Sequence, residues 1–346
     1  MRFVMAGGGT GGHVIPSIAV ARQLKQKGHD VFFIGTREGY EGKLVPKSGF
    51  PIEWIEIGGL MRVGFRQMRQ TLFQLPTSVL RSYKLLRGVS AVFSMGGYVA
   101  APVMLAAWIR RIPIVIMEPN AMPGVTNRRL GKIAKRILVS FEEAAKYFPS
   151  DRVEVTGLPV RQEFFDVPDR EPGQELHLLV TGGSQGAKRL NDALPEAYPS
   201  LENIRVVHQT GTRDNGAVAS RFASSRLNGE VVTFIDDMPK AFADADLVVC
   251  RSGAGTVAEL AAAGKPAILV PFPFAADDHQ FHNAKALRDA GAAILVRDSE
   301  MNGARLLKEL ERLDATELKR MSLAARRFAK RGAAERAAEL LIALGR

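Results

Sequence analysis

Short apolar runs alternate with longer segments of helical periodicity along the whole chain. In the first part of the sequence, the runs that predict buried strands are RFVMA, DVFFIG, PIEWIEI, AVFSM, IPIVIM and RILVS. The segments between them are amphipathic, and the plainest helices are HVIPSIAVARQLKQKG and YEGKLVPKSG. Strands that alternate with helices in this way are typical of a parallel, doubly wound α/β domain.

The same pattern starts again in the second part of the chain. The strands expected there are LHLLV, IRVVHQTG, EVVTFID, DLVVC, PAILVPF and AAILV. Between the two series, VEVTGLPVRQEFFDVPDREPGQE has three prolines and no clear periodicity, which predicts a linker. We expect one domain at residues 1–157 and another at residues 158–329, with a C-terminal helix at about residues 330–346 that packs back on the first. Two such Rossmann-like domains would face a central cleft, since sheets of this kind hold ligands at the carboxyl ends of their strands.

One segment has the length of a membrane span. Residues 88–109 contain no charge over 22 positions, and about 20 apolar residues are enough to cross a bilayer. Gly96, Gly97 and Pro102 interrupt the segment, however. A buried strand, a glycine turn and a buried helix therefore explain it better than a transmembrane helix.

Composition places the chain among ordinary globular proteins. Apolar residues make up 46% and charged residues 24% of 346 residues, which is enough chain for two cores. The single cysteine, Cys250, excludes an internal disulfide bond and fits a reducing compartment. The apolar stretch before the first glycines is too short for a secretory signal, so we expect none.

Charge is distributed unevenly between the two predicted domains. Residues 1–157 carry 22 Lys and Arg against 10 Asp and Glu, whereas the remaining residues carry 25 against 26. Between Glu56 and Glu142 there are 13 basic residues and one acid, Glu118. This asymmetry favours an anionic partner for the first domain, such as nucleic acid, a membrane surface or a phosphorylated substrate. A solvated basic face without a partner is the alternative.

Glycine-rich turns are the most informative local feature. They are GGGTGGH, SMGGY, GGSQGA, RSGAGT and, less clearly, IGGLM. In the first four, a predicted strand precedes the glycines and a predicted helix follows them. The start of a helix offers unpaired N–H donors and a positive dipole end, which suits phosphate, and glycine lets the phosphate approach. Four such turns over two domains predict a ligand with several phosphates, or two phosphorylated ligands.

Two common nucleotide motifs explain these turns poorly. The first turn fits G-x-G-x-x-G only by choosing among many glycines, and Gly35 and Thr36 stand where a dinucleotide site would need an acid. The sequence contains no GxxxxGK[ST] motif, which argues against a P-loop nucleotide site.

Six motifs together resemble one bacterial enzyme family. They are GGTGGH at residues 8–13, MGGYV at 95–99, GGSQGA at 182–187, FIDDM at 234–238, CRSGAGTVAE at 250–259 and DDHQFHNA at 277–284. In this order they are similar to the motifs of the UDP-N-acetylglucosamine–N-acetylmuramyl-(pentapeptide) pyrophosphoryl-undecaprenol N-acetylglucosaminyltransferases, the MurG family. That family converts lipid I to lipid II in peptidoglycan synthesis.

The resemblance implies the GT-B fold of an inverting glycosyltransferase with no bound catalytic metal and no resident cofactor, although a divalent cation could assist. It implies that the second domain holds UDP-N-acetylglucosamine and that the first holds lipid I, whose muramyl C4 hydroxyl is the acceptor. It also implies a peripheral enzyme on the cytoplasmic face of the bacterial inner membrane. The implied partners are the anionic membrane surface and other cell-wall synthesis proteins, and no nucleic acid.

Site residues carry over from the family by position. His13 is the candidate general base for the acceptor hydroxyl, since an imidazole can take a proton at neutral pH. Its alternative role is a hydrogen bond that supports the glycine loop. The residues implied for UDP-N-acetylglucosamine are Thr10, Gly11, Gly12, Asn120, Arg161, Ser184, Ile235, Ala254, Gly255, Thr256, Val257, Ala258, Glu259, Gln280 and Asn283. The candidates for the acceptor diphosphate are Gly9, Gly96, Gly97 and Tyr98.

The resemblance also implies a role for several of these residues. Asn120 would contact the sugar, Arg161 and Ser184 the diphosphate region, and Ile235 the uracil. Glu259 would accept hydrogen bonds from both ribose hydroxyls, although a carboxylate in the first turns of a helix can also merely compensate the helix dipole. Gln280 and Asn283 are three residues apart and would reach sugar hydroxyls together.

The sequence departs from the family pattern at three positions near these residues, one of which is His279, where some relatives have glutamine. Pro119 stands where many relatives have glutamine and restricts the backbone beside Asn120. Leu158 stands where asparagine is frequent.

Other chemical groups point less clearly to a site. Asp236–Asp237 and Asp277–Asp278 lack a third ligand and are interpreted as acids at helix starts. His279 and His282 are three residues apart, without a further metal-ligand pattern, and are interpreted as residues lining the cleft. Cys250 ends an apolar run and is expected in the core.

The segment at residues 63–88 predicts an amphipathic helix, which Pro76 should kink or split. An apolar stripe along it consists of Phe65, Met68, Leu72, Leu75, Val79, Tyr83 and Leu86, and its cations are Arg62, Arg66, Arg69, Arg81, Lys84 and Arg87. Packing of this stripe into the protein core explains it as well as contact with a membrane does. Phe73, Leu80 and Trp108 lie off the stripe and, with the cations, could rest on an anionic bilayer.

Two other functions are compatible with a fold of this kind. One is another UDP-sugar enzyme, such as a lipid glucosyltransferase or a UDP-sugar 2-epimerase, but an epimerase would leave the basic first domain unexplained. The other is a non-catalytic nucleotide-binding or RNA-binding protein, which the absence of aromatic-rich basic motifs disfavours.

Overall fold

The chain folds, in a computed structural model, into two compact units. The structure describes residues 1–58, 65–171 and 173–346, with the backbone alone for residues 65–72. Unit 1 consists of Met1–Val160 and Lys330–Arg346, and unit 2 consists of Arg161–Ala329. Each unit has its own parallel sheet with helices on both faces, which is the doubly wound architecture that the alternating pattern predicts.

Unit 1 is built on a seven-stranded parallel sheet in the order β3-β2-β1-β4-β5-β6-β7. Its strands are β1 (Arg2–Gly7), β2 (Asp30–Gly35), β3 (Ile52–Trp54), β4 (Ala91–Gly96), β5 (Ile114–Glu118), β6 (Arg136–Val139) and β7 (Val153–Val155). Its helices are α1 (Gly11–Gln26), α2 (Glu41–Lys47), α3 (Phe65–Leu85), α4 (Ala100–Ile109), α5 (Val125–Leu130), α6 (Glu142–Ala145) and α15 (Ala333–Gly345), with short 3-10 turns at η1 (Gly131–Ile133) and η2 (Ser150–Arg152).

Unit 2 repeats this plan with a six-stranded parallel sheet in the order β10-β9-β8-β11-β12-β13. Its strands are β8 (Leu176–Thr181), β9 (Ile204–Gln209), β10 (Asn228–Val232), β11 (Leu247–Cys250), β12 (Ala267–Leu269) and β13 (Ala293–Leu295). Its helices are α7 (Gln162–Phe165), α8 (Lys188–Ala197), α9 (Asn215–Ala223), α10 (Met238–Asp244), α11 (Ala254–Ala263), α12 (His279–Asp289), α13 (Gly303–Leu310) and α14 (Ala315–Phe328), with 3-10 turns at η3 (Tyr198–Ser200), η4 (Ala276–Asp278) and η5 (Asp298–Glu300).

The central strands are buried on both faces because helices cover both sides of each sheet. Phe3, Val4, Met5 and Ala6 of β1 are all 0% exposed. In the register of the sheet, Met5 lies opposite Phe33 of β2 and Phe93 of β4. Continuous apolar runs are therefore what these positions require, as is usual in parallel sheets.

Strand order reverses at one place in each sheet. In unit 1 the chain winds outward from β1 through β2 on one side and from β4 through β5 on the other. In unit 2 the same reversal occurs between β8 and β11. Loops at the carboxyl ends of the two strands diverge there and leave room for a ligand. The glycine turns after β1, β4, β8 and β11 are these loops.

The uncharged segment at residues 88–109 forms β4, a glycine turn and α4, as expected. No helix in the described part of the chain is long and apolar enough to cross a membrane. The stretch treated as a structureless linker contains two elements that the sequence analysis missed, β7 and α7. Both are short, so their apolar residues show too few repeats for a period to be recognised.

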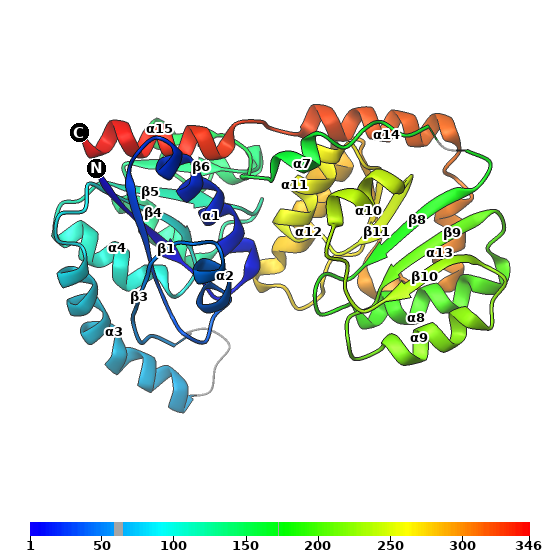
Figure 1. Ribbon diagram of the computed structural model, residues 1–346, viewed down its shortest axis with the longest axis horizontal. Helices are drawn as coiled ribbons and strands as arrows, with labels where there is room; N and C mark the ends of the chain where they lie inside the picture. The colour runs from blue at the N-terminus through cyan, green and yellow to red at the C-terminus, as the bar shows by residue number, and fades with distance from the viewer. Residues whose placement is uncertain (59–64, 172) are drawn as a thin grey trace. The chain divides into compact units, whose positions relative to one another are not determined.

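The C-terminal residues divide between the units. α14 belongs to unit 2, whereas α15 belongs to unit 1 and packs against α1 and the sheet (Figure 1). The side chain of Gln23 in α1 donates to Glu335 at 3.1 Å, and Arg336 forms an ion pair with Glu154 of β7 at 2.6 Å.

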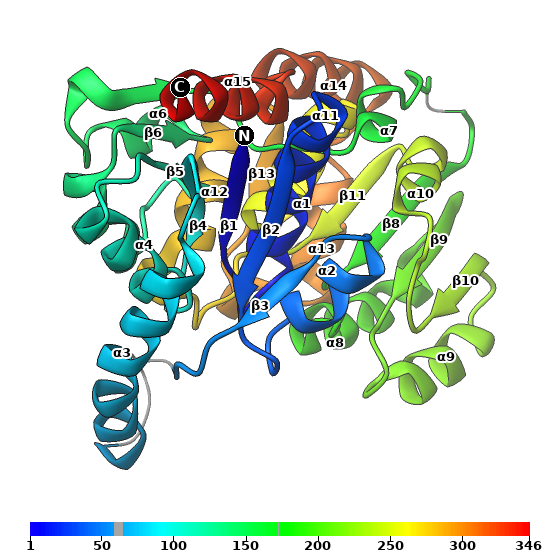
Figure 2. The ribbon, with the colours of Figure 1, turned by 60° about the vertical axis from the view of Figure 1, so that its left-hand side comes forward.

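Helix α3 runs beside α4 on one side of unit 1 (Figure 2). Pro76 was expected to kink or split this helix; α3 continues through it without a split, and the expected kink stays a prediction. A proline removes one N–H donor, and the remaining turns keep theirs. On the described part of the stripe, Leu86 is buried and Leu75 and Val79 pack against the core. Arg62 and the side chains of Phe65, Arg66, Met68, Arg69 and Leu72 lie outside the described residues.

Several large apolar side chains of α3 and α4 face outward together with cations. Phe73 is 74% exposed, Leu80 57% and Trp108 57%. Tyr83 is also exposed, and the Arg110 guanidinium stacks on its ring at 4.4 Å. We call the surface formed by Phe73, Leu80, Tyr83, Trp108, Ile109, Arg81, Lys84, Arg87 and Arg110 the apolar–basic surface.

Candidate active site

Unit 1 brings the loops after β1, β4 and β5 to the same edge of its sheet, because these strands are neighbours. A Cβ atom at Gly97 would lie 3.3 Å from His13 Nδ1, and a Cβ atom at Gly9 would lie 3.3 Å from the Tyr98 ring. His13, Gly9, Gly97 and Tyr98 are therefore packed together, as the motifs suggested. Gly97 has a φ of +81°, a conformation that side chains rarely adopt.

His13 lies in the first turn of α1, and its imidazole is oriented by the loop that precedes it. Nδ1 is 3.2 Å from the carbonyl oxygen of Gly8. A carbonyl oxygen can only accept, so this contact assigns a proton to Nδ1, and in the neutral imidazole Nε2 then carries the lone pair. This tautomer is the one that a base acting through Nε2 requires.

The N-terminus of α1 is suited to an anion. Thr10 is the N-cap residue, and its hydroxyl makes no capping hydrogen bond to the helix. The first turn contains no acidic residue. The N–H groups at this helix start, which include those of Gly11 and Gly12, can therefore point at a phosphate group. The N–H of Gly9, by contrast, already donates to Glu41 Oε2 at 2.8 Å.

Glu118 organises the loop that carries Asn120. This carboxylate at the end of β5 is 1% exposed. It accepts hydrogen bonds from the backbone N–H of Asn120 (2.9 Å), from the Asn120 side chain (3.2 Å) and from the Asn127 side chain (2.8 Å). Burial raises the pKa of Glu118 to about 7, although these donors favour its charged form. Glu118 thus holds the loop that contains Pro119 through Asn120 and Asn127.

Unit 2 positions its candidate residues through one buried amide side chain. Gln209, at the end of β9, is 1% exposed. Its Nε2 donates to the carbonyl oxygen of Gly183 at 2.9 Å, and its Oε1 accepts from the N–H of Ile235 at 2.9 Å. Gln209 therefore ties the exposed loop of Ser184 to the segment of Ile235, two parts of the chain implied to hold opposite ends of a nucleotide.

Glu259 lies on α11, the helix that follows the glycine turn after β11, together with Ala254, Gly255, Thr256, Val257 and Ala258. Burial raises the pKa of Glu259 to about 7, and the nearby Arg161 guanidinium opposes that rise. Arg161 is the N-cap residue of α7 and stacks over Phe164 at 4.9 Å. The Arg161 guanidinium and the Glu259 carboxyl group of unit 2 are thus close enough to interact electrostatically.

Gln280 and Asn283 lie on α12, but both are engaged by the protein backbone. Gln280 Oε1 accepts from the N–H of Phe272 at 3.0 Å. Asn283 is 0% exposed and donates to the carbonyl oxygen of Ser252 at 3.2 Å. Ser252 in turn donates from its hydroxyl to the Gln280 carbonyl oxygen at 2.8 Å. The sequence analysis expected the Asn283 side chain to reach a sugar hydroxyl. In the structure this side chain is buried and faces the loop after β11.

The sequence analysis missed four polar residues at these loops: Glu41, Glu118, Asn127 and Gln209. Glu118 alone carried a signal, since it is the one acid in a long basic stretch and directly precedes Pro119 and Asn120. Glu41 and Gln209 bind backbone groups 26 or more positions away, and Asn127 binds the Glu118 side chain, which no local pattern reveals.

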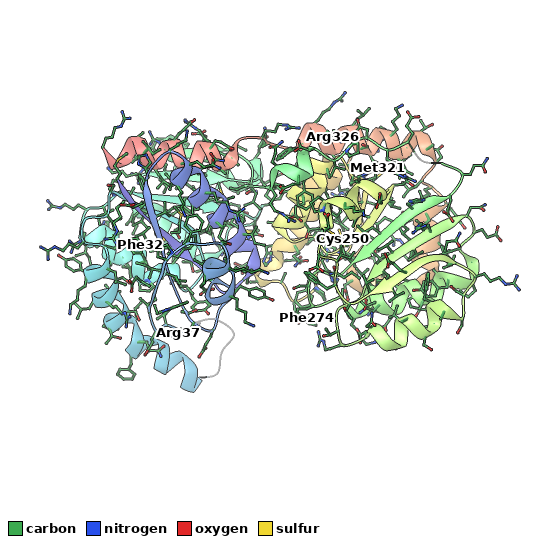
Figure 3. The ribbon with its side chains drawn as sticks, viewed as in Figure 1. Phe32, Arg37, Cys250, Phe274, Met321 and Arg326 are labelled. Carbon is green, nitrogen blue, oxygen red and sulfur yellow. The ribbon has the colours of Figure 1, made fainter. Side chains whose placement is uncertain are left out.

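Two of the remaining candidate groups have a local role in the described residues. Asp237 caps α10 by accepting from the Lys240 N–H at 3.0 Å, as expected. Cys250 is 1% exposed at the end of β11 (Figure 3). Across residues 1–58, 65–171 and 173–346, no three His, Cys, Asp or Glu side chains come together as a metal site. The turn IGGLM extends into the residues outside this description.

Comparison with known proteins identifies the family. Residues 3–139 match the glycosyltransferase family 28 N-terminal domain, and residues 177–339 match the glycosyltransferase family 28 C-terminal domain. The chain is 57% identical over 98% of its length, and 95% of the relative's, to the UDP-N-acetylglucosamine–N-acetylmuramyl-(pentapeptide) pyrophosphoryl-undecaprenol N-acetylglucosamine transferase of Solibacter usitatus. It is 43% identical to the enzyme of the same name from Myxococcus xanthus, over 90% of this chain and 84% of that one.

A solved structure agrees with these relatives. The crystal structure of Acinetobacter baumannii MurG matches 99% of both chains with a TM-score of 0.85 and 35% sequence identity. The two parallel-sheet domains are therefore those of a GT-B glycosyltransferase. The chain belongs to glycosyltransferase family 28 and, within it, to the UDP-N-acetylglucosamine–N-acetylmuramyl-(pentapeptide) pyrophosphoryl-undecaprenol N-acetylglucosamine transferases.

Proposed function

We propose that this enzyme transfers N-acetylglucosamine from UDP-N-acetylglucosamine to the C4 hydroxyl of the muramyl sugar of lipid I. The product is lipid II, the disaccharide-linked lipid of peptidoglycan synthesis, and the anomeric configuration is inverted. The observation that carries this proposal is the 57% identity, over nearly the whole chain, to a relative named for this transfer. Glycine turns suited to phosphate lie where the strand order reverses in each sheet. They support the proposal, since donor and acceptor each contain a diphosphate.

In this mechanism His13 removes the proton from the acceptor hydroxyl as the new glycosidic bond forms. Its Nδ1–H is held by the Gly8 carbonyl oxygen, which directs the lone pair on Nε2 to the reacting hydroxyl. The departing UDP carries away the electron pair of the broken bond. N–H groups at helix starts stabilise the negative charge that develops on its diphosphate.

The donor is assigned mainly to unit 2, as the family resemblance implies. Ile235 flanks the uracil, Glu259 accepts hydrogen bonds from both ribose hydroxyls, and Arg161 and Ser184 bind the diphosphate. Thr10, Gly11, Gly12 and Asn120 stay predicted donor contacts by their positions in the family motifs. Gln280 contributes to the sugar site. Asn283 is assigned to support this site indirectly, since its amide group donates to the Ser252 carbonyl oxygen in the loop after β11.

The acceptor diphosphate is assigned to Gly96, Gly97 and Tyr98, next to His13. Gly9 was a further candidate, but Glu41 accepts the hydrogen bond of its N–H. We therefore assign Gly9 to the floor of this site, beneath the Tyr98 ring, rather than to direct N–H donation. The proposal needs no resident cofactor, and assistance by a divalent cation stays a prediction.

The direct test of this function uses the purified protein, labelled UDP-N-acetylglucosamine and a short-chain analogue of lipid I. We expect label to appear in a disaccharide lipid, and a β-specific N-acetylhexosaminidase should release it. If UDP-N-acetylglucosamine is instead converted to its 2-epimer with no acceptor present, or if the acceptor is never glycosylated, the proposal fails.

We further propose that the apolar–basic surface rests on the anionic cytoplasmic face of the inner membrane, where the lipid acceptor lies. Exposed aromatic and aliphatic side chains can enter the headgroup region, and each nearby cation adds about 1 kcal/mol of attraction to anionic lipid. Phe73, Leu80 and Trp108 are the exposed apolar side chains that carry this assignment. Other cell-wall synthesis proteins stay predicted partners without a surface assigned to them.

The protein should bind vesicles that contain anionic lipid and should be released by salt. Phe73→Ser should weaken binding roughly tenfold to a hundredfold, because a buried aromatic side chain contributes about 1.5–3 kcal/mol. Leu323→Ser is the matched control, since Leu323 of α14 is 50% exposed but lies in unit 2. Vesicle sedimentation measures both. Equal binding to neutral vesicles at all salt concentrations would contradict the assignment.

A further inference from the structure

A fully buried carboxylate lies beneath the glycine loop of unit 1 and has no part in the mechanism above. Glu41, the first residue of α2, is 0% exposed. Its Oε1 accepts from the backbone N–H (3.0 Å) and the hydroxyl (2.7 Å) of Thr36, and its Oε2 accepts from the N–H of Gly9 (2.8 Å). Burying a charged group is costly unless it is well hydrogen-bonded. These three bonds satisfy Glu41 and fix the groups that make them.

Three glycines make room for this carboxylate. A Cβ atom at Gly8, Gly35 or Gly39 would overlap the Glu41 side chain. Gly8 follows β1, Gly35 is the last residue of β2, and Gly39 lies between β2 and α2. These three glycines are therefore needed to leave space for the Glu41 side chain, whether or not a phosphate binds nearby.

One peptide group joins Glu41 to His13. The N–H of Gly9 and the carbonyl of Gly8 belong to the same planar trans peptide unit, in which they point in opposite directions. Glu41 accepts from that N–H on one side, and the carbonyl oxygen accepts from His13 Nδ1 at 3.2 Å on the other. Hydrogen bonds at the two ends of one amide polarise and strengthen each other.

A second contact anchors the same arrangement. Burial together with the nearby Glu41 charge raises the pKa of Tyr98. The Tyr98 ring also lies against Gly9. The loops that follow β1, β2 and β4 thus meet around one carboxylate.

We propose that Glu41 is a positioning residue for His13. Its carboxylate holds the plane of the Gly8–Gly9 peptide so that the Gly8 carbonyl fixes the Nδ1–H tautomer and the direction of the imidazole. This inference rests on the proposed function only in taking His13 as the base. Glu41 touches no substrate and acts through one backbone amide.

The test is Glu41→Gln in the full-length protein, assayed with UDP-N-acetylglucosamine and the lipid I analogue. Gln keeps the size of the side chain but has one acceptor oxygen, so it cannot accept from Thr36 and Gly9 together. A displaced catalytic group costs on the order of 10²-fold, so kcat should fall roughly tenfold to a hundredfold. The KM for the donor should change less than about threefold, because the main donor contacts are elsewhere.

NMR of the imidazole nitrogens adds a readout that general destabilisation would not move. The His13 signal, identified by its loss in His13→Gln, should show the Nδ1–H tautomer in the wild type and a mixture of tautomers in Glu41→Gln. Thr36→Val serves as a second variant if Glu41→Gln fails to fold. It removes one hydrogen bond of the carboxylate, and kcat should fall in the same direction by a smaller factor. Glu154→Gln is the control, since it removes a carboxylate of unit 1 that pairs with Arg336.

Each outcome decides the inference. An unchanged tautomer and a kcat near that of the wild type in a folded Glu41→Gln protein would overturn it. Lost activity with an unchanged His13 tautomer would also overturn it, since the role would then be structural. If the wild type itself forms no disaccharide lipid, the proposed function fails, whereas the tautomer comparison still tests the link between Glu41 and His13.

Discussion

Replacing His13 with alanine should lower kcat by roughly 10²–10⁴-fold, the usual contribution of a general base. The affinity for UDP-N-acetylglucosamine should stay nearly the same, because the principal donor residues lie in unit 2. The structural reason is the tautomer: the Gly8 carbonyl oxygen accepts from Nδ1, so Nε2 can take the proton of the acceptor hydroxyl. Steady-state kinetics with the lipid I analogue, together with direct measurement of UDP-N-acetylglucosamine binding, would separate the two effects.

A matched variant controls for the loss of an imidazole. His29→Ala removes a histidine of unit 1 that packs against the edge of Phe3, away from the glycine loop. It should keep kcat within about threefold of the wild type, as substitutions outside the site usually do. A His13→Ala enzyme that turns over at the wild-type rate would remove His13 from the mechanism and leave it as support for the loop.

Replacing Glu259 with alanine should raise the KM for UDP-N-acetylglucosamine by roughly 10²-fold. Two hydrogen bonds from ribose hydroxyls to a carboxylate would be lost, and each charge-assisted bond contributes about 1.5–3 kcal/mol, part of which solvent recovers. Binding of UDP alone should weaken by a similar factor, because the ribose is common to both ligands. Isothermal titration with UDP measures this without any acceptor.

The pH dependence of donor binding gives the same residue a second test. Burial raises the pKa of Glu259 from its ordinary value of 4.5 to about 7, so the carboxyl group gains a proton as the pH falls through about 7. A protonated carboxyl group accepts hydrogen bonds less well, and the KM for UDP-N-acetylglucosamine should therefore rise as the pH is lowered from 8 to 6. The Glu259→Gln variant should lose this dependence and bind weakly at every pH.

An exposed carboxylate provides the control for both measurements. Glu317→Gln removes an acid of α14 that pairs with Arg320 at the surface. Its donor KM and the pH dependence of that KM should match the wild type. If Glu259→Ala binds UDP as tightly as the wild type does, Glu259 compensates the dipole of α11 and does not hold the ribose.

Much of the fold can be predicted from the sequence, because each buried strand appears as a short continuous run of apolar residues. Parallel strands covered on both faces need continuous apolar runs, and RFVMA and LHLLV are such runs. The glycine turns between strand and helix are equally local, since strand, turn and helix start are contiguous in sequence. The elements that the sequence analysis missed, β7 and α7, are too short to show a period.

The candidate site residues follow from the sequence only where they lie in or beside a family motif. His13, Tyr98 and Glu259 each lie within a few residues of a glycine turn, so the motifs name them as candidates. Asn283 shows the limit of predicting contacts from spacing. Asn283 and Gln280 both lie on α12, but the Asn283 side chain faces inward and donates to the Ser252 carbonyl oxygen. Which way a side chain faces depends on what packs against its helix, and spacing does not contain that information.

By itself, the sequence determined two doubly wound domains, the strand–glycine–helix turns, and the basic character of the first domain, because periodicity, glycine and charge are properties of neighbouring residues. The tertiary structure decided what holds those turns in place. Glu41 reaches Gly9 across 32 positions, and Gln209 spans 26 positions to both Gly183 and Ile235. A buried polar group must satisfy its hydrogen bonds with whatever backbone the fold brings beside it. Those partners exist only once the sheets have assembled.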